Sequence, residues 1–407
     1  MTTGTAFRLA ARTGRLASSA IGSVLRLGDR ADIIGLAAGS PAPESFCSAE
    51  VAEVIARLLA TRPDALQYGD TAGLPSLREW VAGQATAILD RVVPADETVL
   101  AHGSQQALDL ICKAVLDPGD VVVVDRPSYV GALQVFRLFE ADVVGVPIAA
   151  DEGLAELARR FAGGLRPKLI YVVPNFANPT GATLSAARRA ELVRLADRYG
   201  CLVVEDDPYG ELGYAAGTER PPALAALDPN VIRLGSFSKV LFPAARLGYL
   251  TAPRALVPVL NTFKQAADLG NSHLIELVVD DLVQRPGFLA GRLDQARRLY
   301  RTRRDTLADA LRHEFGTALE FQEPDGGFFI WARLADGTDA TALLGEALAE
   351  GVSFVPGSAF YAGDPEVDVL RLAFSCAPLA ALAEAPTRLR RAWLRVSDGS
   401  ARKNGSA

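Results

Sequence analysis

The chain has 407 residues, of which 49% are hydrophobic and 22% are charged. At roughly 100–200 residues per domain this length predicts two or three domains, and the apolar content supports large cores and excludes a disordered chain. The formal net charge of −6 argues against nucleic acid as a partner, although local arginines can still bind small acidic ligands.

The four cysteines, Cys47, Cys112, Cys201 and Cys376, lie far apart and form no Cys-x-x-Cys pair. Neither a metal site nor a disulfide framework is therefore indicated, and reduced thiols are typical of the cytoplasm. No secretory signal is recognisable, and no apolar run reaches about 18 residues, so no membrane-spanning helix is predicted. These features favour a cytoplasmic protein.

The N-terminal part of the chain predicts helices separated by turns. The segment from Ala6 to about Leu27 has arginines and no acidic residue. Transit peptides and amphipathic helices share this composition, and we expect a helix. A short apolar segment then enters a turn at Gly39, where a glycine backbone can approach a ligand. Further helices are predicted over Ser48–Ala60, with Ser48 as N-cap, and over Leu77–Leu89.

Apolar, β-branched runs alternate with helical segments in the next part of the chain. Such runs are typical of strands buried on both faces of a parallel sheet. The runs are Val121–Val124, Val143–Val146, Leu169–Val173 and Leu202–Val204, and the helices include one opening at Gly103 and one over Ala186–Arg198. The alternation predicts an α/β sheet with helices on both faces.

Polar residues follow directly after most of these predicted strands. In such sheets ligands bind beyond the carboxyl ends of the strands, so these residues are candidates for a functional site. The segments are His102-Gly103-Ser104-Gln105, Asp125-Arg126-Pro127-Ser128-Tyr129, Asn175-Phe176-Ala177-Asn178, Glu205-Asp206-Asp207-Pro208-Tyr209 and Ser236-Phe237-Ser238-Lys239. One edge of one sheet therefore gathers hydroxyl, amide, carboxyl and amine groups.

The last of these segments, with Arg246 shortly downstream, suits an aldehyde cofactor that carries a phosphate. The amine of Lys239 would form an imine, while Ser236, Ser238 and Arg246 hold the phosphate. The same short pattern occurs in many solvated loops. The polar residues at the other strand ends distinguish this segment from such loops.

After about Val278 the pattern changes to that of a second, smaller α+β domain, to which the N-terminal segment can return. Its predicted elements are a helix over Gly291–Phe315, an apolar segment at Phe328–Trp331, a helix over Ala340–Glu350, strands at Val352–Val355 and Leu370–Ala373, and a helix over Leu379–Leu394. We divide the chain into an N-terminal arm with part of the small domain (1–50), a large domain (51–285) and a C-terminal small domain (286–396). The Ser, Gly and Lys content of residues 397–407 predicts a disordered tail.

In this order, the motifs resemble those of the fold type I, class I/II aminotransferases, which use pyridoxal 5′-phosphate, and are most similar to the branch with 2-aminoadipate and kynurenine aminotransferases. The resemblance implies a large cofactor-binding domain with a mostly parallel, mixed sheet of the seven-stranded type, flanked by helices, and a smaller α+β domain. The matching segments are Leu66-Gln67-Tyr68-Gly69, Gly103-Ser104-Gln105-Gln106-Ala107, Pro174–Gly181, Glu205–Gly210, Gly235–Lys239, Arg246-Leu247-Gly248-Tyr249 and Arg371-Leu372.

The resemblance also implies catalytic roles. Lys239 would hold the cofactor through a Schiff base, and its freed amine would then move the proton. Asp206 would keep the pyridine nitrogen protonated. We favour it over its neighbour Asp207 because the family places this acid three residues before the tyrosine, here Tyr209. Tyr209 and Asn178 would hydrogen-bond the phenolic oxygen of the ring.

The remaining cofactor contacts follow from the same resemblance. The phosphate would be bound by backbone amides at a helix N-terminus and by hydroxyl and guanidinium groups, from Ser104, Gln105, Ser236, Ser238 and Arg246. Tyr129 would stack on the ring. Tyr68 would reach the phosphate of the neighbouring subunit, which implies a homodimer with shared active sites.

The substrate α-carboxylate would be bound by Arg371 through a bidentate pair, with Asn178 and the backbone amide of Gly39 beside it. The chain departs from the family at Ala38, where a glycine is usual, and the added methyl is expected to narrow the space near the substrate. Arg26 and Arg30 lie in the segment that would face the substrate side chain. The sequence therefore leaves open whether the side chain of the substrate is hydrophobic or acidic.

We expect transamination between an α-amino acid and a 2-oxo acid. Elimination, decarboxylation and oxidation of amino acids start from the same covalent adduct and need the same motifs, so the sequence leaves them as alternatives. A transcription regulator with an aminotransferase-like domain would need an N-terminal winged-helix reader. The residues before the first motif are too few for one.

Overall fold

The computed structural model describes residues 9–15, 30, 32–214 and 220–404 of the chain. Most of the helix expected over Ala6–Leu27 lies outside these residues, and the part within them forms a short 3-10 helix, η1 (Ala11–Arg15). In the described ranges no helix is long and apolar enough to cross a membrane. The same ranges contain no group of three or more His, Cys, Asp or Glu side chains placed to hold a metal ion.

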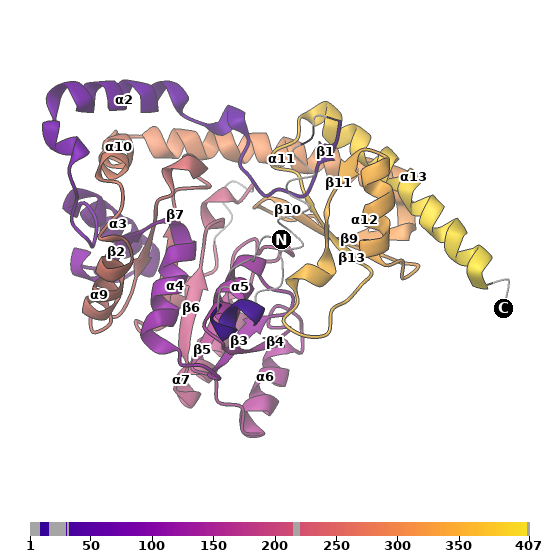
Figure 1. The fold of residues 1–407 in the computed structure, drawn as a ribbon, viewed down its shortest axis with the longest axis horizontal. Coiled ribbons are helices and arrows are strands. Elements are labelled where there is room, and N and C mark those ends of the chain that lie inside the picture. The colour runs from indigo at the N-terminus through magenta and orange to yellow at the C-terminus, as the bar shows by residue number, and fades with distance from the viewer. Residues whose placement is uncertain (1–8, 16–29, 31, 215–219, 405–407) are drawn as a thin grey trace, which may run out of the picture.

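A seven-stranded sheet forms the centre of the larger part of the molecule (Figure 1). Its strands lie in the order β2-β8-β7-β6-β5-β3-β4; β8 runs antiparallel to β2 and β7, and the other pairs are parallel. The strands are β2 (Thr98–Ala101), β3 (Val121–Asp125), β4 (Asp142–Val146), β5 (Leu169–Val172), β6 (Leu202–Asp206), β7 (Ile232–Ser236) and β8 (Gly248–Thr251). The predicted mixed, mostly parallel sheet is confirmed.

Helices cover both faces of this sheet, and the valine runs explain why. Successive side chains of a strand point to opposite faces. Val122 and Val124 therefore join one hydrophobic core, and Val123 joins the core on the other face. The first core includes α4 (Gly103–Val115), α5 (Val130–Leu138) and α9 (Val257–Asp268), and the second includes α3 (Pro75–Leu89), α6 (Gly153–Ala162), α7 (Ala186–Tyr199) and α8 (Leu224–Leu227). A further core lies between α2 (Ser48–Thr61), α3 and α10 (His273–Gln284).

The smaller part of the molecule is built on a four-stranded antiparallel sheet with the order β12-β13-β10-β9. Its strands are β9 (Leu319–Phe321), β10 (Phe329–Leu334), β12 (Val355–Pro356) and β13 (Val369–Ala373), and its helices are α12 (Ala340–Ala349) and α13 (Leu379–Asn404). The N-terminal segment returns to this part, because β1 (Ile34–Gly35) pairs in parallel with β11 (Val352–Ser353).

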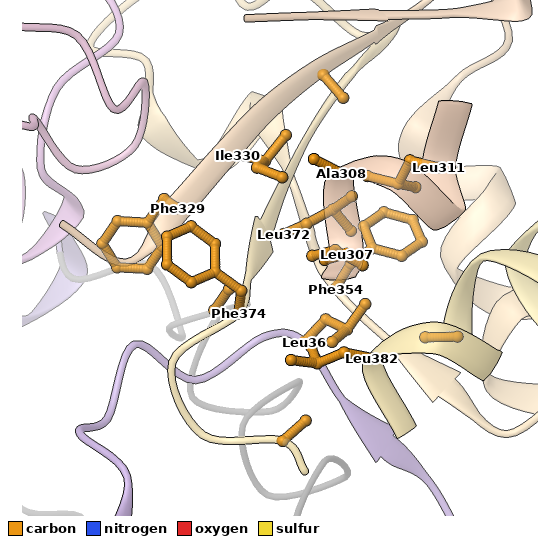
Figure 2. Close-up of a cluster of buried hydrophobic side chains, with 14 of the residues drawn as sticks. Leu36, Leu307, Ala308, Leu311, Phe329, Ile330, Phe354, Leu372, Phe374 and Leu382 are labelled. Carbon is orange, nitrogen blue, oxygen red and sulfur yellow. The ribbon is translucent and has the colours of Figure 1, made fainter. Parts of the chain in front are cut away.

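One long helix, α11 (Phe288–Phe315), runs from the helices of the large sheet to the small sheet (Figure 1). Its apolar face enters the core of the smaller part, where Leu307, Ala308 and Leu311 pack against strand residues such as Ile330 and Leu372 (Figure 2). Leu36 and Ala42, which follow β1, and Leu382 and Leu389 of the C-terminal helix α13 belong to the same core, which therefore joins residues far apart in the sequence.

Three local predictions were wrong. Cys47, not Ser48, is the N-cap of α2, and it makes no side-chain capping bond. The predicted strand Val352–Val355 is divided between two sheets, because Phe354 turns into the core between β11 and β12. The tail predicted to be disordered from residue 397 continues α13 to Asn404, since a formed helix extends without a new nucleation cost.

Candidate active site

A cavity of about 270 Å³ lies between the two sheets, beyond the carboxyl ends of β5, β6 and β7. This is the place where open α/β sheets bind ligands. Of the residues singled out from the sequence, the cavity brings together Gly39, Ser104, Gln105, Tyr129, Asn178, Asp206, Tyr209, Ser236, Ser238, Lys239, Arg246 and Arg371. The strand-end polar groups therefore meet as expected.

Lys239 lies in the middle of this cavity. Its Nζ donates a hydrogen bond to the carbonyl oxygen of Gly39 at 3.1 Å. Burial, together with the nearby charges of Arg246 and Arg371, lowers the pKa of Lys239 to about 8. An amine with this pKa is present as the neutral nucleophile far more often than an exposed lysine near neutral pH.

Asp206 is the last residue of β6 and lines the cavity. Its Oδ2 accepts a hydrogen bond from the Tyr171 hydroxyl at 2.7 Å. Its Oδ1 is buried and has no partner among the described residues. Burial raises the pKa of Asp206 to about 7, so the carboxyl needs a donor or cation at this point.

The neighbouring acid, Asp207, has a different environment. Because side chains alternate along a strand, it points to the opposite side of the sheet from Asp206. There it forms an ion pair with Arg233 at 2.9 Å, and both side chains are almost fully buried. Asp206 is therefore the acid that faces the cavity.

One end of the cavity is built to bind an anion. Gly103 is the first residue of α4. The backbone amides of Gly103 and Ser104 therefore point outward from a helix N-terminus. Arg246, in the left-handed region with φ 45°, has no acidic partner in the described part of the chain. A Cβ on Gly103 would lie 3.2 Å from the Arg246 Nη2, which explains the glycine at this tight position. The Ser236 Oγ accepts a bond from the Ser238 amide at 3.1 Å and fixes the turn.

The cavity also contains a second cation without an acidic partner among the described residues, Arg371 on β13. Its Nη1 donates to the Asn178 Oδ1 at 2.8 Å, and its Nη2 donates to the carbonyl oxygen of Ala37. The guanidinium lies over the rings of Phe329 and Phe360, with its Cζ 4.3 and 4.9 Å from their centroids. Burial lowers the pKa of Arg371 to about 10. No described carboxylate lies within ion-pair distance, so the cavity favours a ligand carboxylate at Arg371.

Two aromatic hydroxyls also line the cavity. Burial raises the pKa of Tyr209 and of Tyr129 above the usual range, so both stay neutral hydrogen-bond donors. Tyr129 caps the start of α5, and a Cβ on Gly131 would lie 2.5 Å from its ring. Only a glycine at that position leaves the Tyr129 ring in place.

Three residues named from the sequence, Tyr68, Ala38 and Arg30, do not line the cavity of this chain. The Tyr68 side chain is 82% exposed on the loop before α3, and the prediction for it concerns the neighbouring subunit. Ala38 is not among the lining residues. Arg30 is exposed and pairs with Asp32 at 2.7 Å. Arg26 lies outside the described residues.

Comparison with known proteins identifies the family. Residues 31–389 match the family model described as aminotransferase class I and II. The chain belongs to the class I and II aminotransferases.

Relatives and solved structures agree over nearly the whole chain. This aminotransferase is 39% identical over 391 residues to the 2-aminoadipate transaminase of Thermus thermophilus, covering 93% of this chain and 94% of that protein. It is 35% identical over 381 residues to aromatic-amino-acid aminotransferase 1 of Thermococcus litoralis, covering 91% and 90%. Its fold matches the α-aminoadipate aminotransferase LysN of Thermus thermophilus, complexed with N-(5′-phosphopyridoxyl)-L-leucine, at a TM-score of 0.88 and 36% identity, covering 96% and 98%. The kynurenine aminotransferase of Pyrococcus horikoshii matches at a TM-score of 0.89 and 34% identity, covering 96% and 97%.

The protein is thus a pyridoxal phosphate-dependent transaminase that acts on amino acids and 2-oxo acids. Its own residues fit this cofactor. The unpartnered Asp206 Oδ1 suits a protonated ring nitrogen, the α4 N-terminus with Arg246 suits a phosphate, and the buried Lys239 suits an aldehyde.

Sequence reasoning missed several residues of the aminotransferase site. Phe329 lines the cavity beneath Gly39 and stacks on Arg371, and Tyr171 holds Asp206. Ala37, Val130, Val173 and Pro208 complete the walls. Phe329 and Tyr171 lie within apolar runs that read as core strands, and their contacts with the site depend on how the two sheets meet. No signal in the sequence distinguishes them.

Replacing Gly39 with alanine should impair substrate binding. A Cβ at this position would lie 2.4 Å from the Phe329 Cζ, and Phe329 is fully buried under Arg371. Overpacking of this kind costs about 1–3 kcal/mol, so we expect kcat/KM for the amino donor to fall about 5- to 150-fold. Steady-state kinetics of Gly39→Ala measure this. The additional change Phe329→Leu makes room for the methyl and should recover part of the loss; an unchanged kcat/KM in the single variant would refute the steric account.

Proposed function

We propose that the transaminase carries out both half-reactions with Lys239 as its covalent anchor and proton carrier, Asp206 as the partner of the ring nitrogen and Arg371 as the carboxylate site. One observation carries this assignment. A buried lysine, an unpaired carboxylate oxygen and two unpaired arginines line a single cavity between the sheets.

When bound, pyridoxal phosphate supplies a ring that accepts electrons from the substrate Cα. Asp206 supports this by holding a proton on the ring nitrogen, aided by the Tyr171 hydrogen bond that fixes the carboxyl. Tyr209 and Asn178 would hold the phenolic oxygen, and Tyr129 would cover the ring face. The phosphate would be held by Ser104, Gln105, Ser236, Ser238 and Arg246.

Lys239 then moves a proton at the substrate Cα. A pKa near 8, against the ordinary lysine value of 10.5, raises the neutral fraction of its amine about 300-fold at neutral pH. A general base works best when its pKa is close to the working pH. Burial next to two guanidinium groups provides this tuning.

Arg371 positions the substrate by its α-carboxylate. The stacking of its guanidinium between Phe329 and Phe360 fixes the plane of the donor fork before substrate arrives. Gly39 lines the same cavity, and its amide would donate to the same carboxylate. Such preorganisation lowers the entropy cost of placing the Cα–H bond next to Lys239.

We propose that the amino donors belong to the classes named for the relatives, aromatic amino acids and 2-aminoadipate. A screen of these donors with 2-oxoglutarate and pyruvate as acceptors identifies the pair. Adding a donor alone to the holoenzyme should convert the visible cofactor band into that of pyridoxamine phosphate. Release of ammonia from the donor without any oxo acid would instead indicate elimination.

We further propose a homodimer in which Tyr68 completes the site of the partner subunit. Near Tyr68, the side chain of Leu66 is 73% exposed and that of Leu269 is 55% exposed. The Thr71 hydroxyl, on the loop of Tyr68, donates a hydrogen bond to the Leu269 carbonyl oxygen at 2.8 Å and so holds the two segments together. Exposed apolar and aromatic groups on an ordered loop are typical of an interface.

Replacing Tyr68 with phenylalanine should weaken retention of the cofactor without loss of the dimer. A lost hydrogen bond to a charged group costs about 1.5–3 kcal/mol, which predicts about a 10- to 100-fold rise in the dissociation constant of the cofactor. Fluorescence titration of the apoenzyme measures this, and sedimentation gives the oligomeric state. A fully active monomer, or unchanged affinity in Tyr68→Phe, would contradict the shared site.

We propose the cytoplasm as the place of action. All four cysteines are free thiols, and a reducing compartment keeps thiols in this state. Fractionation of cells that express the tagged full chain tests this, with activity expected in the cytoplasmic fraction.

A further inference from the structure

Asp207 is a buried charged residue that follows Asp206 but does not line the cavity, and it takes no part in the proposed chemistry. The exposed fraction of its side chain is 8%, and that of its partner Arg233 is 5%. A buried ion pair is costly to form and gives little net stability compared with apolar packing. Its location directly behind the active site therefore calls for a function other than stability.

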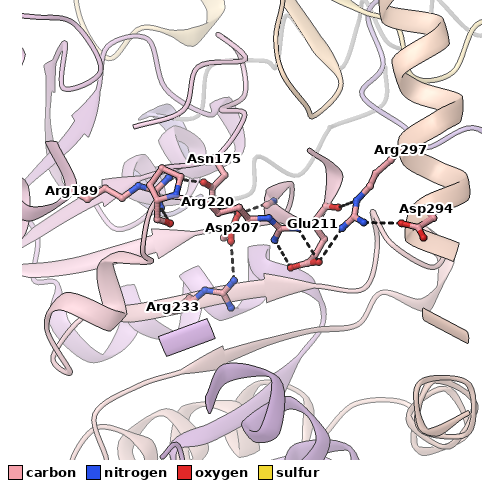
Figure 3. A network of polar contacts seen from close by, with 10 residues as sticks. Asn175, Arg189, Asp207, Glu211, Arg220, Arg233, Asp294 and Arg297 are labelled. Atoms are coloured by element: carbon pink, nitrogen blue, oxygen red, sulfur yellow. Dashed lines mark hydrogen bonds and ion pairs between the residues drawn. The ribbon is translucent and has the colours of Figure 1, made fainter. Parts of the chain in front are cut away.

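The carboxylate of Asp207 accepts three hydrogen bonds, each from a different segment (Figure 3). Its Oδ1 accepts from the Asn175 Nδ2 at 3.0 Å, in the loop after β5, and from the Gly210 amide at 2.9 Å, in the loop after β6. Its Oδ2 accepts from the Arg233 Nη2 on β7 at 2.9 Å. One side chain thus joins the loop after β5, the loop after β6 and the second residue of β7.

Each of these segments carries a residue of the cavity. Asn178 follows Asn175, Tyr209 precedes Gly210, and the strand of Arg233 leads to Lys239. We propose that Asp207 is a positioning residue that fixes the mutual separation of these three cavity groups. This role rests on the proposed functions of Asn178, Tyr209 and Lys239.

The surroundings of Asp207 leave it little freedom. Arg189, which is fully buried, donates to the Asn175 Oδ1 at 2.6 Å and to the Pro174 carbonyl oxygen at 3.0 Å, so the amide that faces Asp207 is itself fixed. A Cβ on Gly210 would lie 2.5 Å from either oxygen of Asp207. Only a glycine therefore lets the loop pass this close to the carboxylate.

The Asp207–Arg233 ion pair fixes geometry, and its two charges have opposite effects on the pKa of Asp206. The Asp207 charge raises the pKa of Asp206, and the Arg233 charge lowers it. Removing Asp207 leaves only the effect of Arg233, which lowers the pKa of Asp206 and keeps this carboxyl ionised as the partner of the ring nitrogen. The loss of activity is therefore expected from the placement of groups. A misplacement of about 1 Å in an active site lowers turnover by about 10²-fold.

Asp207→Ala and Asp207→Asn test this role in the full-length holoenzyme. We expect Asp207→Ala to lower kcat about 10²-fold and to reduce the visible circular dichroism of the bound cofactor by half or more, because the cofactor loses its fixed orientation. The KM for the amino donor should change less than about 3-fold, since Arg371 is on the other sheet. Asp207→Asn keeps the oxygen that faces Asn175 and Gly210, and it should recover part of both signals.

Glu211→Gln is the matched control, because Glu211 lies on the same loop and pairs with Arg220 and Arg297 in an exposed network (Figure 3). It should leave kcat and the dichroic band unchanged. A lower melting temperature of Asp207→Ala with unchanged kcat and dichroism would show a structural role only and overturn the inference, as would equal losses in Glu211→Gln. Should the alanine variant fail to fold, Asp207→Asn gives the same measurements. If Lys239→Ala loses the visible absorption band while the Asp207 variants keep a normal one, Lys239 is the anchor whatever the kcat of the Asp207 variants shows. Failure of this inference is thereby distinguished from failure of the proposed anchor.

Discussion

Replacing Lys239 with alanine is expected to abolish the visible absorption band of the bound cofactor and to lower the transamination rate about 10⁴-fold or more. The variant loses the amine that bonds the aldehyde and also the base that moves the proton, and general base catalysis alone contributes about 10²- to 10⁴-fold. The phosphate contacts at α4 and Arg246 stay, so the cofactor should still bind. Absorption spectra and single-turnover kinetics measure the two effects.

Lys168→Ala is a suitable control for this experiment. Lys168 is half-exposed and pairs with Asp120 at 2.6 Å, far from the cavity walls. Its removal should leave both the band and the rate unchanged. If Lys239→Ala kept the visible band, the central assignment would be wrong, and another amine would have to hold the cofactor.

Replacing Arg371 with lysine is expected to lower kcat/KM for the amino donor about 10²- to 10³-fold while leaving the cofactor band intact. Lysine keeps the charge but loses the planar fork that binds a carboxylate at two points. Truncating one partner of a buried, hydrogen-bonded charge pair costs about 2–5 kcal/mol. The released Asn178 oxygen would also lack its donor at 2.8 Å.

Arg333→Lys on β10 controls for changes to the small sheet. Arg333 lies on the neighbouring strand, on the same face of the sheet as Arg371, but it pairs with Asp368 at 2.7 Å and does not line the cavity. Titration of the half-reaction with donor gives the apparent dissociation constant for each variant. Arg371→Lys with unchanged kcat/KM would exclude Arg371 as the carboxylate site, and loss of the band would indicate a collapsed site.

The sequence was sufficient to predict the large sheet and most of the site, because both depend on local patterns. A run such as Val121–Val124 is buried on both faces wherever it lies, and the polar residue that ends such a strand must lie at the carboxyl edge. The choice of Asp206 over Asp207 rested on the family spacing of three residues before Tyr209, and Asp206 is the one of the two that lines the cavity.

The remaining features depend on contacts between distant segments, which no local pattern encodes. Phe329 belongs to the small sheet, yet it limits the space at Gly39. Phe354 divides one apolar run between two sheets, because the N-terminal strand β1 takes the first half as its partner. The three hydrogen bonds of Asp207 come from segments around three different strands. In the sequence alone, Asp207 therefore cannot be distinguished from any acidic residue that happens to follow a functional one.

Helix α11 gives the two sheets a mechanical connection. It has 28 residues, and at 1.5 Å per residue it is about 42 Å long. Its first turn packs with the helices of the large sheet, through Leu289, and its later turns form the core beneath β13. A tilt of about 3° at its start would therefore displace its far end by about 2 Å. The helix acts as a lever arm, so substitutions at its first turn can change the gap between Arg371 and Lys239 without touching either residue.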